Sequence, residues 1–209
     1  MPDLRRDAEQ WSQPRGQMLM RLPITLHMAT DAGEPVAERA GVRRWLERAN
    51  ADLAPFGIQL EVRAVRHLPE GWDSVTRWGQ RRQLAHYAPT DGTIHVFVIE
   101  ELDRRKRPVL GRKVRGLHWR YRGVNPKLAQ REYIMVTRGA PTTTLAHEIG
   151  HLFGLRHSTA TDNIMCSCRR GSNVGFTYDQ GMLMRDGVRA YMAKQNVRYG
   201  TRHADRRRR

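Results

Sequence analysis

The chain has 209 residues and a formal net charge of +16, from 37 Lys and Arg against 21 Asp and Glu. This length suits the core of one domain, and no run of 18 uncharged apolar residues predicts a membrane span. The only cysteines, Cys166 and Cys168, are two positions apart, where the backbone seldom allows an unstrained disulfide. The composition therefore excludes a disulfide-dense scaffold.

The positive charge is spread along the chain. Without residues 202–209, which hold five Arg and one Asp, 32 basic residues still face 20 acidic ones, a net charge of +12. Such a surface attracts acidic peptides, anionic lipid or nucleic acid, and salt weakens the attraction. Only four of the basic residues are Lys, a bias that also arises from genome composition, so a solvated basic surface is the favoured interpretation.

The two ends of the chain are polar. Residues 1–16 lack the apolar stretch of a secretory signal, so we expect a flexible extension there. This favours the cytoplasm if Met1 is the true start, and secretion if a leader precedes it. We expect one domain over residues 17–200 and a disordered basic tail over 201–209.

The first half of the domain alternates strands and helices. Residues 17–30 predict a strand with one buried face, because apolar residues alternate from Leu22 to Met28. Glu34 to Ala54 predicts an amphipathic helix, and Ile58 to Ala64 a second strand. Ser74 to Tyr87 fits either a polar helix or a surface excursion. In the helix, the apolar residues at spacings of three and four are Val42, Trp45, Leu46, Ala49 and Leu53.

The second half centres on one strongly apolar strand, Thr93 to Leu102, which we expect to be covered on both faces. Asp103 to Gln130 is basic and rich in Gly and Pro, which predicts loop with one edge strand inside Val114 to Tyr121. A last strand is expected at Tyr133 to Thr137. A helix then begins near Pro141 and runs to about Phe153.

That helix carries residues typical of a metal site. Residues 147–157 read His-Glu-Ile-Gly-His-Leu-Phe-Gly-Leu-Arg-His. His147 and His151 lie one turn apart on the same face, with Glu148 beside them. Gly154 can end the helix in a left-handed conformation, so that His157 returns towards the metal. Three neutral nitrogen ligands leave a fourth position for water, which is the arrangement of a catalytic zinc.

These residues resemble the metzincin zinc signature, and Asn163-Ile164-Met165 resembles the methionine turn of that group. The resemblance is closest to matrixins, because Ser158 follows the third histidine and Met165 comes eight residues after it. It implies an α+β fold of the metzincin-like (zincin) type, a twisted five-stranded mixed sheet with two helices above the cleft. A small irregular lower lobe would follow about residue 154 and end in a helix from Tyr178 to Lys194.

The resemblance also implies roles for single residues. His147, His151 and His157 would bind one catalytic Zn²⁺, Glu148 would be the general base and proton shuttle, and Met165 would underlie the site. Ordinary core packing is the alternative for Met165. The edge strand would pair with an extended peptide, so the implied protein is a monomeric zinc metalloendopeptidase acting on a protein or peptide, with an acidic one as one option.

The chain departs from the matrixin pattern after Met165. An aromatic and proline wall segment is replaced by Cys166-Ser167-Cys168-Arg169-Arg170-Gly171, so side-chain preference is not predicted. His118 and Asp103 are too few for further metal sites, and we expect no calcium. Tyr178 is either an oxyanion donor or, as we favour, a core or capping residue. Cys166 and Cys168 either block zinc as thiolates or, as we favour, line the lower lobe.

Two other functions stay open at this point. One is a basic nucleic-acid-binding protein in which zinc only braces the fold, and the other is a peptide-binding pseudoprotease. A bracing site would need a fourth protein ligand and would not need Glu148. The presence of both the base and the ligands argues against the pseudoprotease.

Overall fold

The computed structural model describes residues 19–103, 114–168 and 174–206, with side chains in the last helix up to residue 193. The extension expected at 1–16 and the end of the chain at 207–209 lie outside the described residues, as does part of the loop expected after Asp103.

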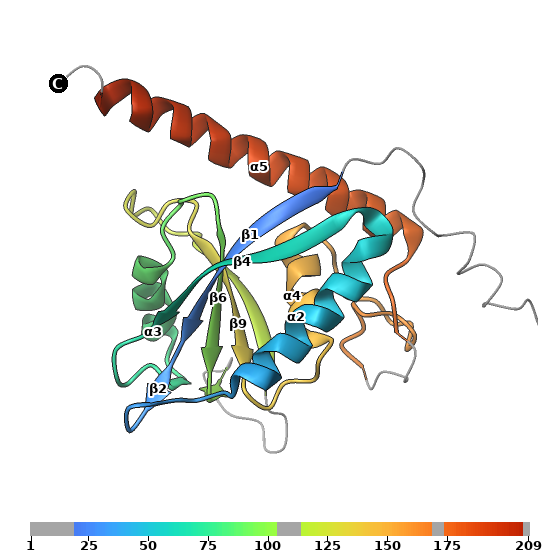
Figure 1. Cartoon of the computed structure of the whole chain (residues 1–209), viewed down its shortest axis with the longest axis horizontal. Helices are drawn as coiled ribbons and strands as arrows, with labels where there is room; N and C mark the ends of the chain where they lie inside the picture. Colours follow the sequence, from blue (N-terminus) through green and yellow to red (C-terminus); the bar gives the residue numbers. More distant parts are fainter. Residues whose placement is uncertain (1–18, 104–113, 169–173, 207–209) are drawn as a thin grey trace, which may run out of the picture.

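The core is a five-stranded sheet in the order β4-β1-β6-β9-β8 (Figure 1). Strands β4, β1, β6 and β9 are parallel and β8 is antiparallel to β9, which confirms the predicted mixed sheet. The strands span Met20–Met28 (β1), Ile58–His67 (β4), Ile94–Ile99 (β6), Gly116–Arg120 (β8) and Glu132–Thr137 (β9). All six residues of β6 are buried, as its continuous apolar run predicted.

Strand β1 is buried on both faces from Ile24 to Met28, so the prediction of a single buried face was wrong for that part and holds only near its start, where Arg21 is exposed. The polar positions Thr25 and His27 are each only 2% exposed. Both residues can be buried because their polar side-chain atoms are hydrogen-bonded to Thr93, just before the neighbouring strand β6, and to His95 within it. The hydroxyl oxygens of Thr25 and Thr93 are 3.0 Å apart, and Nε2 of His27 lies 2.9 Å from Nδ1 of His95. The alternating pattern predicted that Thr25 and His27 would be exposed, but both are buried because their polar groups are hydrogen-bonded to other buried side chains.

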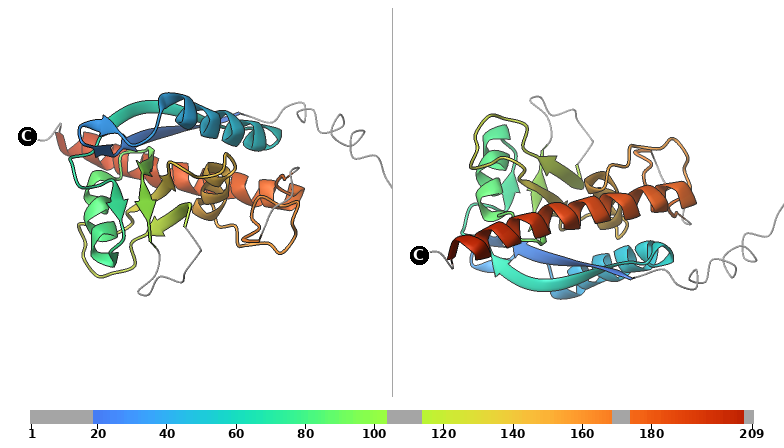
Figure 2. Two further views of the ribbon diagram at one scale, coloured as in Figure 1. Left: turned by 90° about the horizontal axis from the view of Figure 1, so that it is seen from below. Right: turned by 90° about the horizontal axis from the view of Figure 1, so that it is seen from above.

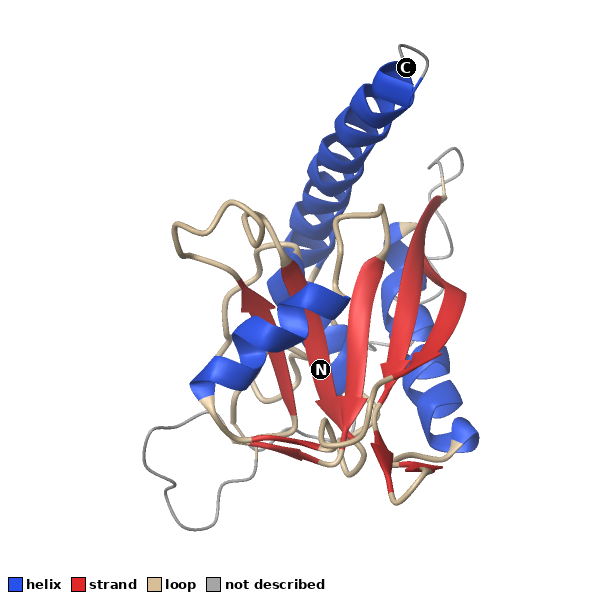
Figure 3. Ribbon diagram, turned by 90° about the vertical axis from the view of Figure 1, so that its left-hand side faces the viewer, coloured by secondary structure: helices blue, strands red, loops and turns tan. Residues whose placement is uncertain are grey.

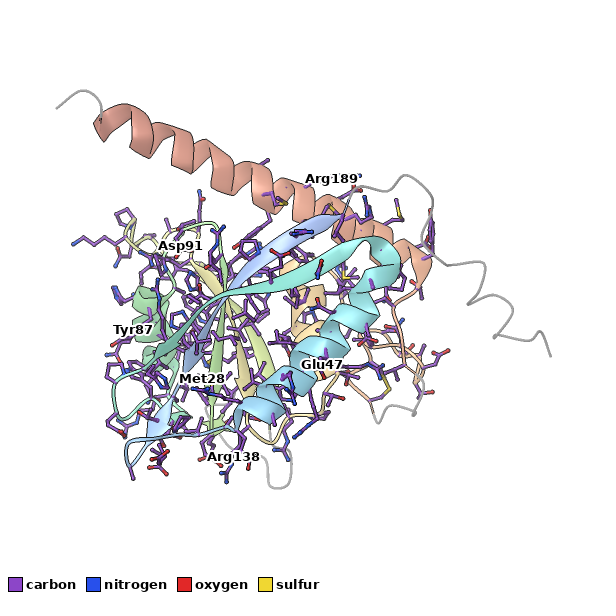
Figure 4. The ribbon with its side chains drawn as sticks, viewed as in Figure 1. Met28, Glu47, Tyr87, Asp91, Arg138 and Arg189 are labelled. Carbon is purple, nitrogen blue, oxygen red and sulfur yellow. A yellow bond between two sulfur atoms is a disulfide. The ribbon has the colours of Figure 1, made fainter. Side chains whose placement is uncertain are left out.

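Helix α2 (Arg39–Leu53) crosses one face of the sheet (Figure 3). It buries Val42, Trp45, Ala49 and Leu53 as predicted, and Glu47 lies on its outer face (Figure 4). The helix begins later than the expected Glu34, because β3 (Glu34–Pro35) pairs with β2 (Thr30–Asp31) in a hairpin. It ends in the 3-10 turn η1 (Ala54–Phe56).

The segment from Ser74 to Tyr87, for which the sequence left a polar helix or a surface excursion open, contains a helix. Strand β5 (Ser74–Val75) pairs with β7 (Glu101–Leu102), and helix α3 (Trp78–Leu84) follows, with the 3-10 turn η2 (Ala85–Tyr87) after it. The Tyr133 hydroxyl of β9 donates to the Arg81 carbonyl at 2.7 Å. This bond fixes α3 against the half of the sheet that contains the edge strand.

Helix α5 (Tyr178–Arg206) lies along the molecule and extends beyond its body (Figures 1 and 2). It continues to Arg206, past both the expected helix end at Lys194 and the domain boundary placed at residue 200. The Tyr191 hydroxyl donates to the Thr93 carbonyl at 3.0 Å, and Gly181 and Gly187 allow close contact with Phe56 and Phe153. No helix in the described ranges is long and apolar enough to cross a bilayer.

Strand β8 lies where the sequence predicted an edge strand, inside Val114 to Tyr121. It is the last strand in the sheet order and pairs only with β9 among the described strands. Helix α4 (Thr144–Leu152) packs against both of these strands and against α2. The edge of β8 and the side of α4 together position the candidate site.

Candidate metal centre

Helix α4 ends in a way that reverses the chain. The Gly154 amide donates to the His151 carbonyl at 3.1 Å, and the Leu155 amide donates to the Gly150 carbonyl at 2.9 Å. These two bonds form a Schellman motif, and Gly154 has the positive φ of 95° that such an end needs. The reversal brings His157 back towards the helix.

The three predicted histidines meet at one point. Each offers a ring nitrogen, and these nitrogens all lie within 4.8 Å of one another. Nε2 of His151 and Nε2 of His157 are 3.0 Å apart. His147 is buried, His151 half-buried and His157 exposed, so the cluster opens from the core towards solvent.

Backbone carbonyls orient two of the rings. Nδ1 of His147 lies 2.7 Å from the Ile164 carbonyl oxygen, and Nδ1 of His151 lies 2.8 Å from that of Leu155. A carbonyl oxygen only accepts, so Nδ1 carries the proton and Nε2 keeps its lone pair. The lone pairs then face the shared space of the cluster.

This donor set fits a zinc ion. Zinc binds imidazole nitrogen at about 2.0–2.1 Å in a tetrahedral arrangement, which places ligand nitrogens about 3.3 Å apart. The observed spacing, from 3.0 Å to within 4.8 Å, lies close to that value. Without a cation, the 3.0 Å contact requires a proton on Nε2 of His157, because Nε2 of His151 carries a lone pair.

Met165 forms the floor beneath α4. It is fully buried, and a Cβ added at Gly150 would lie only 2.5 Å from its sulfur. The turn is closed by the Cys166 amide, which donates to the Asn163 carbonyl at 3.0 Å, and by the Met165 amide, which donates to Oδ1 of Asn163 at 2.8 Å. The glycine inside the histidine motif therefore has a packing role that the motif alone did not reveal.

Glu148 lies under the start of the edge strand. Its side chain is buried, and a Cβ added at Gly116 would be 2.7 Å from Oε1 of Glu148 and 2.6 Å from Cγ2 of Thr144. Only glycine at position 116 allows the β8 backbone to approach the carboxylate so closely. Sequence reasoning missed this residue, and its one signal was a glycine inside a strand-like stretch.

A groove follows the strand edge across the histidine cluster. Two adjoining hollows share Leu117, His118 and His151, so they form one groove along β8. The half beside the start of β8 contains Glu148 and all three clustered histidines. Its far wall includes Ser167, Cys168 and Val174, which replace the aromatic and proline segment of the matrixin pattern.

Of the remaining candidates, His118 lines the groove and Tyr178 does not. Tyr178 is the first residue of α5, is 51% exposed and does not line the groove. His118 faces Glu132, with Nε2 and Oε2 3.6 Å apart. Burial alone would raise the pKa of Glu132, but the nearby His118 ring and the charge and hydrogen bond of Arg120 outweigh burial and hold it below its usual value.

Cys166 and Cys168 form a disulfide, so the prediction that their spacing argues against one was wrong. Their Cα atoms are 5.2 Å apart, inside the usual range, because the chain bends directly after the methionine turn. With both sulfurs in the bond, neither is a thiolate that could block the metal. Cys166 is fully buried, as expected for a residue that lines the lower lobe.

The fold and the cluster define a metallopeptidase-like protein. The structure is similar to metalloproteinase-II from Bacteroides fragilis, with a TM-score of 0.57 and 14% identity, over 83% of this chain and 55% of that one. It is also similar to mature mirolysin from Tannerella forsythia, with a TM-score of 0.54 and 11% identity, over 85% of this chain and 96% of that one. At these identities the likeness shows the fold, which confirms the expected α+β architecture.

The sequence assigns the family. A peptidase family model described as matrixin matches residues 71–180, which is more than half of the chain. The chain belongs to the matrixin family, as the resemblance predicted, and the family implies zinc. No curated protein matches the chain by sequence.

Proposed function

We propose that the protein is a zinc-dependent endopeptidase, with His147, His151 and His157 as ligands of one zinc ion and Glu148 as the general base. The observation that carries the proposal is the convergence of the three imidazoles next to Glu148, inside a groove along an open strand edge. Membership of the matrixin family supports the class of reaction. The expected lack of calcium stays a prediction from the sequence.

The chain's own residues perform the positioning and the proton transfer. An extended peptide pairs with the free edge of β8, which holds its backbone in the groove beside Glu148. Zinc, when bound, supplies a Lewis acid for the scissile carbonyl. Glu148 takes a proton from the attacking water onto a carboxylate oxygen and gives it to the leaving amine. The Ile164 and Leu155 carbonyls keep the His147 and His151 rings oriented during turnover.

Replacing Glu148 tests the proposal. Glu148→Gln removes the proton acceptor but keeps the size of the side chain, so zinc content should stay near one per chain while peptide cleavage falls by about 10²-fold or more. Glu47→Gln on the outer face of α2 is the matched control, because Glu47 is 66% exposed and does not line the groove. Cleavage at the wild-type rate by the zinc-loaded Glu148→Gln protein would refute the assigned role.

The same measurement separates the two other functions. A structural zinc in a nucleic-acid-binding protein needs four protein ligands, whereas the metal-binding cluster among the described residues contains three. A protein that binds peptides without cutting them would show no cleavage in either the wild type or the control.

A further inference from the structure

We infer that the half of the groove beside α3 binds acidic side chains of the substrate, on the N-terminal side of the cleaved bond. The inference rests on the proposed peptidase function and names the substrate class for it. Its residues come from two places, α3 and the end of β8 with the segment that follows it. Those that the argument uses are Trp78, Arg81, Arg82, Arg120, Tyr121 and Arg122.

This half of the groove is strongly cationic. Four arginines line it, and no Asp or Glu is among the described residues that do so. Arg120 is paired with Glu132 at 2.6 Å, and the buried Arg81 contacts the backbone carbonyl of Asp103. Arg82 and Arg122 are exposed, and neither forms an ion pair with a carboxylate of the described residues. These two charges are available to a ligand.

The excess of positive charge around this half of the groove is larger than the basic composition of the whole chain would give. Residues 114–131, which the structure describes and which include all of β8, contain five Lys or Arg and no Asp or Glu. At the ratio of the whole chain, five basic residues would be accompanied by about three acidic ones. The absence of carboxylates along this segment leaves the groove with a field that attracts anionic side chains and excludes cationic ones.

The direction of β8 determines which end of a bound peptide lies near the arginines. Strand β8 runs from Gly116, above Glu148, to Arg120, beside the arginines. An antiparallel pair is slightly more stable per residue than a parallel one, so the peptide runs in the opposite direction. The residues before the scissile bond then lie near Arg82 and Arg122, and those after it lie near Ser167 and Val174.

An acidic peptide is favoured over nucleic acid as the occupant. Trp78, 66% exposed, and Tyr121 offer aromatic faces on which bases could stack. The arginine-lined half is nevertheless continuous with the half that contains Glu148, through Leu117, His118 and His151. A peptide held along β8 fills both halves at once and presents its backbone to the base.

The test uses quenched fluorescent peptides that share one cleaved bond and carry Glu, Ala or Lys at the second and third positions before it. We expect kcat/KM to follow the order Glu, Ala, Lys and the preference for Glu to weaken with salt. Arg82→Ala and Arg122→Ala should each lower the ratio of the Glu to the Ala peptide by about two- to fivefold, as for an exposed ion pair. Arg63→Ala on the opposite edge strand is the matched control and should leave the ratio unchanged.

The outcomes separate the inference from the function on which it rests. Equal cleavage of all three peptides, or an equal loss in Arg63→Ala, would overturn the inference and leave the peptidase intact. No metal-dependent cleavage of any peptide would overturn both. Binding of the same peptides to the zinc-loaded Glu148→Gln protein, measured by fluorescence anisotropy, provides a readout without turnover. Tighter binding of a single-stranded oligonucleotide than of the Glu peptide, lost in Arg82→Ala, would assign the groove to nucleic acid instead.

Discussion

Replacing Gly116 by Ala should impair catalysis while leaving the fold intact. The new methyl group would lie 2.7 Å from the Glu148 carboxylate oxygen and 2.6 Å from Cγ2 of Thr144. Ordinary contact begins near 3.4 Å, so the carboxylate would have to retreat by about 0.7 Å, or the edge strand would have to lift away from α4.

The size of the effect follows from that displacement. A misplacement of about 1 Å in a catalytic group costs on the order of 10²-fold in rate, so a shift of about 0.7 Å predicts a fall in kcat/KM of roughly 10- to 100-fold. Because the Glu148 side chain is flexible, its carboxylate can move and relieve much of the clash. We therefore expect the free energy of unfolding to fall by only about 1–2 kcal/mol.

The assay combines three measurements on Gly116→Ala: peptide cleavage, zinc content and thermal unfolding. Gly41→Ala in α2 is the control, since its added Cβ would have no neighbour closer than 3.8 Å and alanine favours a helix. A zinc-loaded, folded Gly116→Ala protein with wild-type kcat/KM would show that the close approach of β8 to Glu148 does not position the base.

Three further predictions concern stability and the metal. Gly150→Ala would place a methyl group 2.5 Å from the Met165 sulfur, so it should lower the melting temperature despite the better helix propensity of alanine, and unchanged melting would contradict close packing of that floor. Burial, then His95 and Arg66, lower the pKa of His27 to about 3, against an opposing effect of Asp91. The unfolded chain therefore binds a proton at this site that the folded one does not. Stability should fall as pH drops from about 6.5 towards 3, by up to about 1.4 kcal/mol per pH unit, and urea unfolding should show a flatter pH profile for His27→Gln than for the exposed control His67→Gln. Chelation should abolish cleavage and lower the melting temperature, since a ligand at 100 times its Kd contributes about 2.7 kcal/mol; equal melting with and without chelator would argue against a folded-state metal site.

Strongly periodic segments were predictable from the sequence. Burial of apolar side chains requires a strand covered on both faces for the apolar run of β6 and a helix with one buried face for the three-and-four spacing in α2. The spacing of His147, His151 and His157 was also informative, since a helix ending at Gly154 has few ways to place the third histidine.

Features that depend on contacts between distant segments were not predictable. Thr25 and His27 are polar, and their burial is favourable only because Thr93, just before β6, and His95 in β6 lie beside them. Gly116 gains its importance from Glu148 on another element, and the Cys166–Cys168 bond depends on a local bend that spacing does not encode. The arginines of the groove come from α3 and from the end of β8, which only the fold brings together.

The carbonyl that orients His147 belongs to Ile164, in the turn that also contains Met165. Asn163 of that turn is hydrogen-bonded to Gln180 at the start of α5, with distances of 2.9 and 3.2 Å. A nascent chain emerging from the ribosome therefore exposes its histidines well before the residues that align them. Under the proposed ligand set, the geometry that would hold the metal is complete only when the segment through Gln180 has docked.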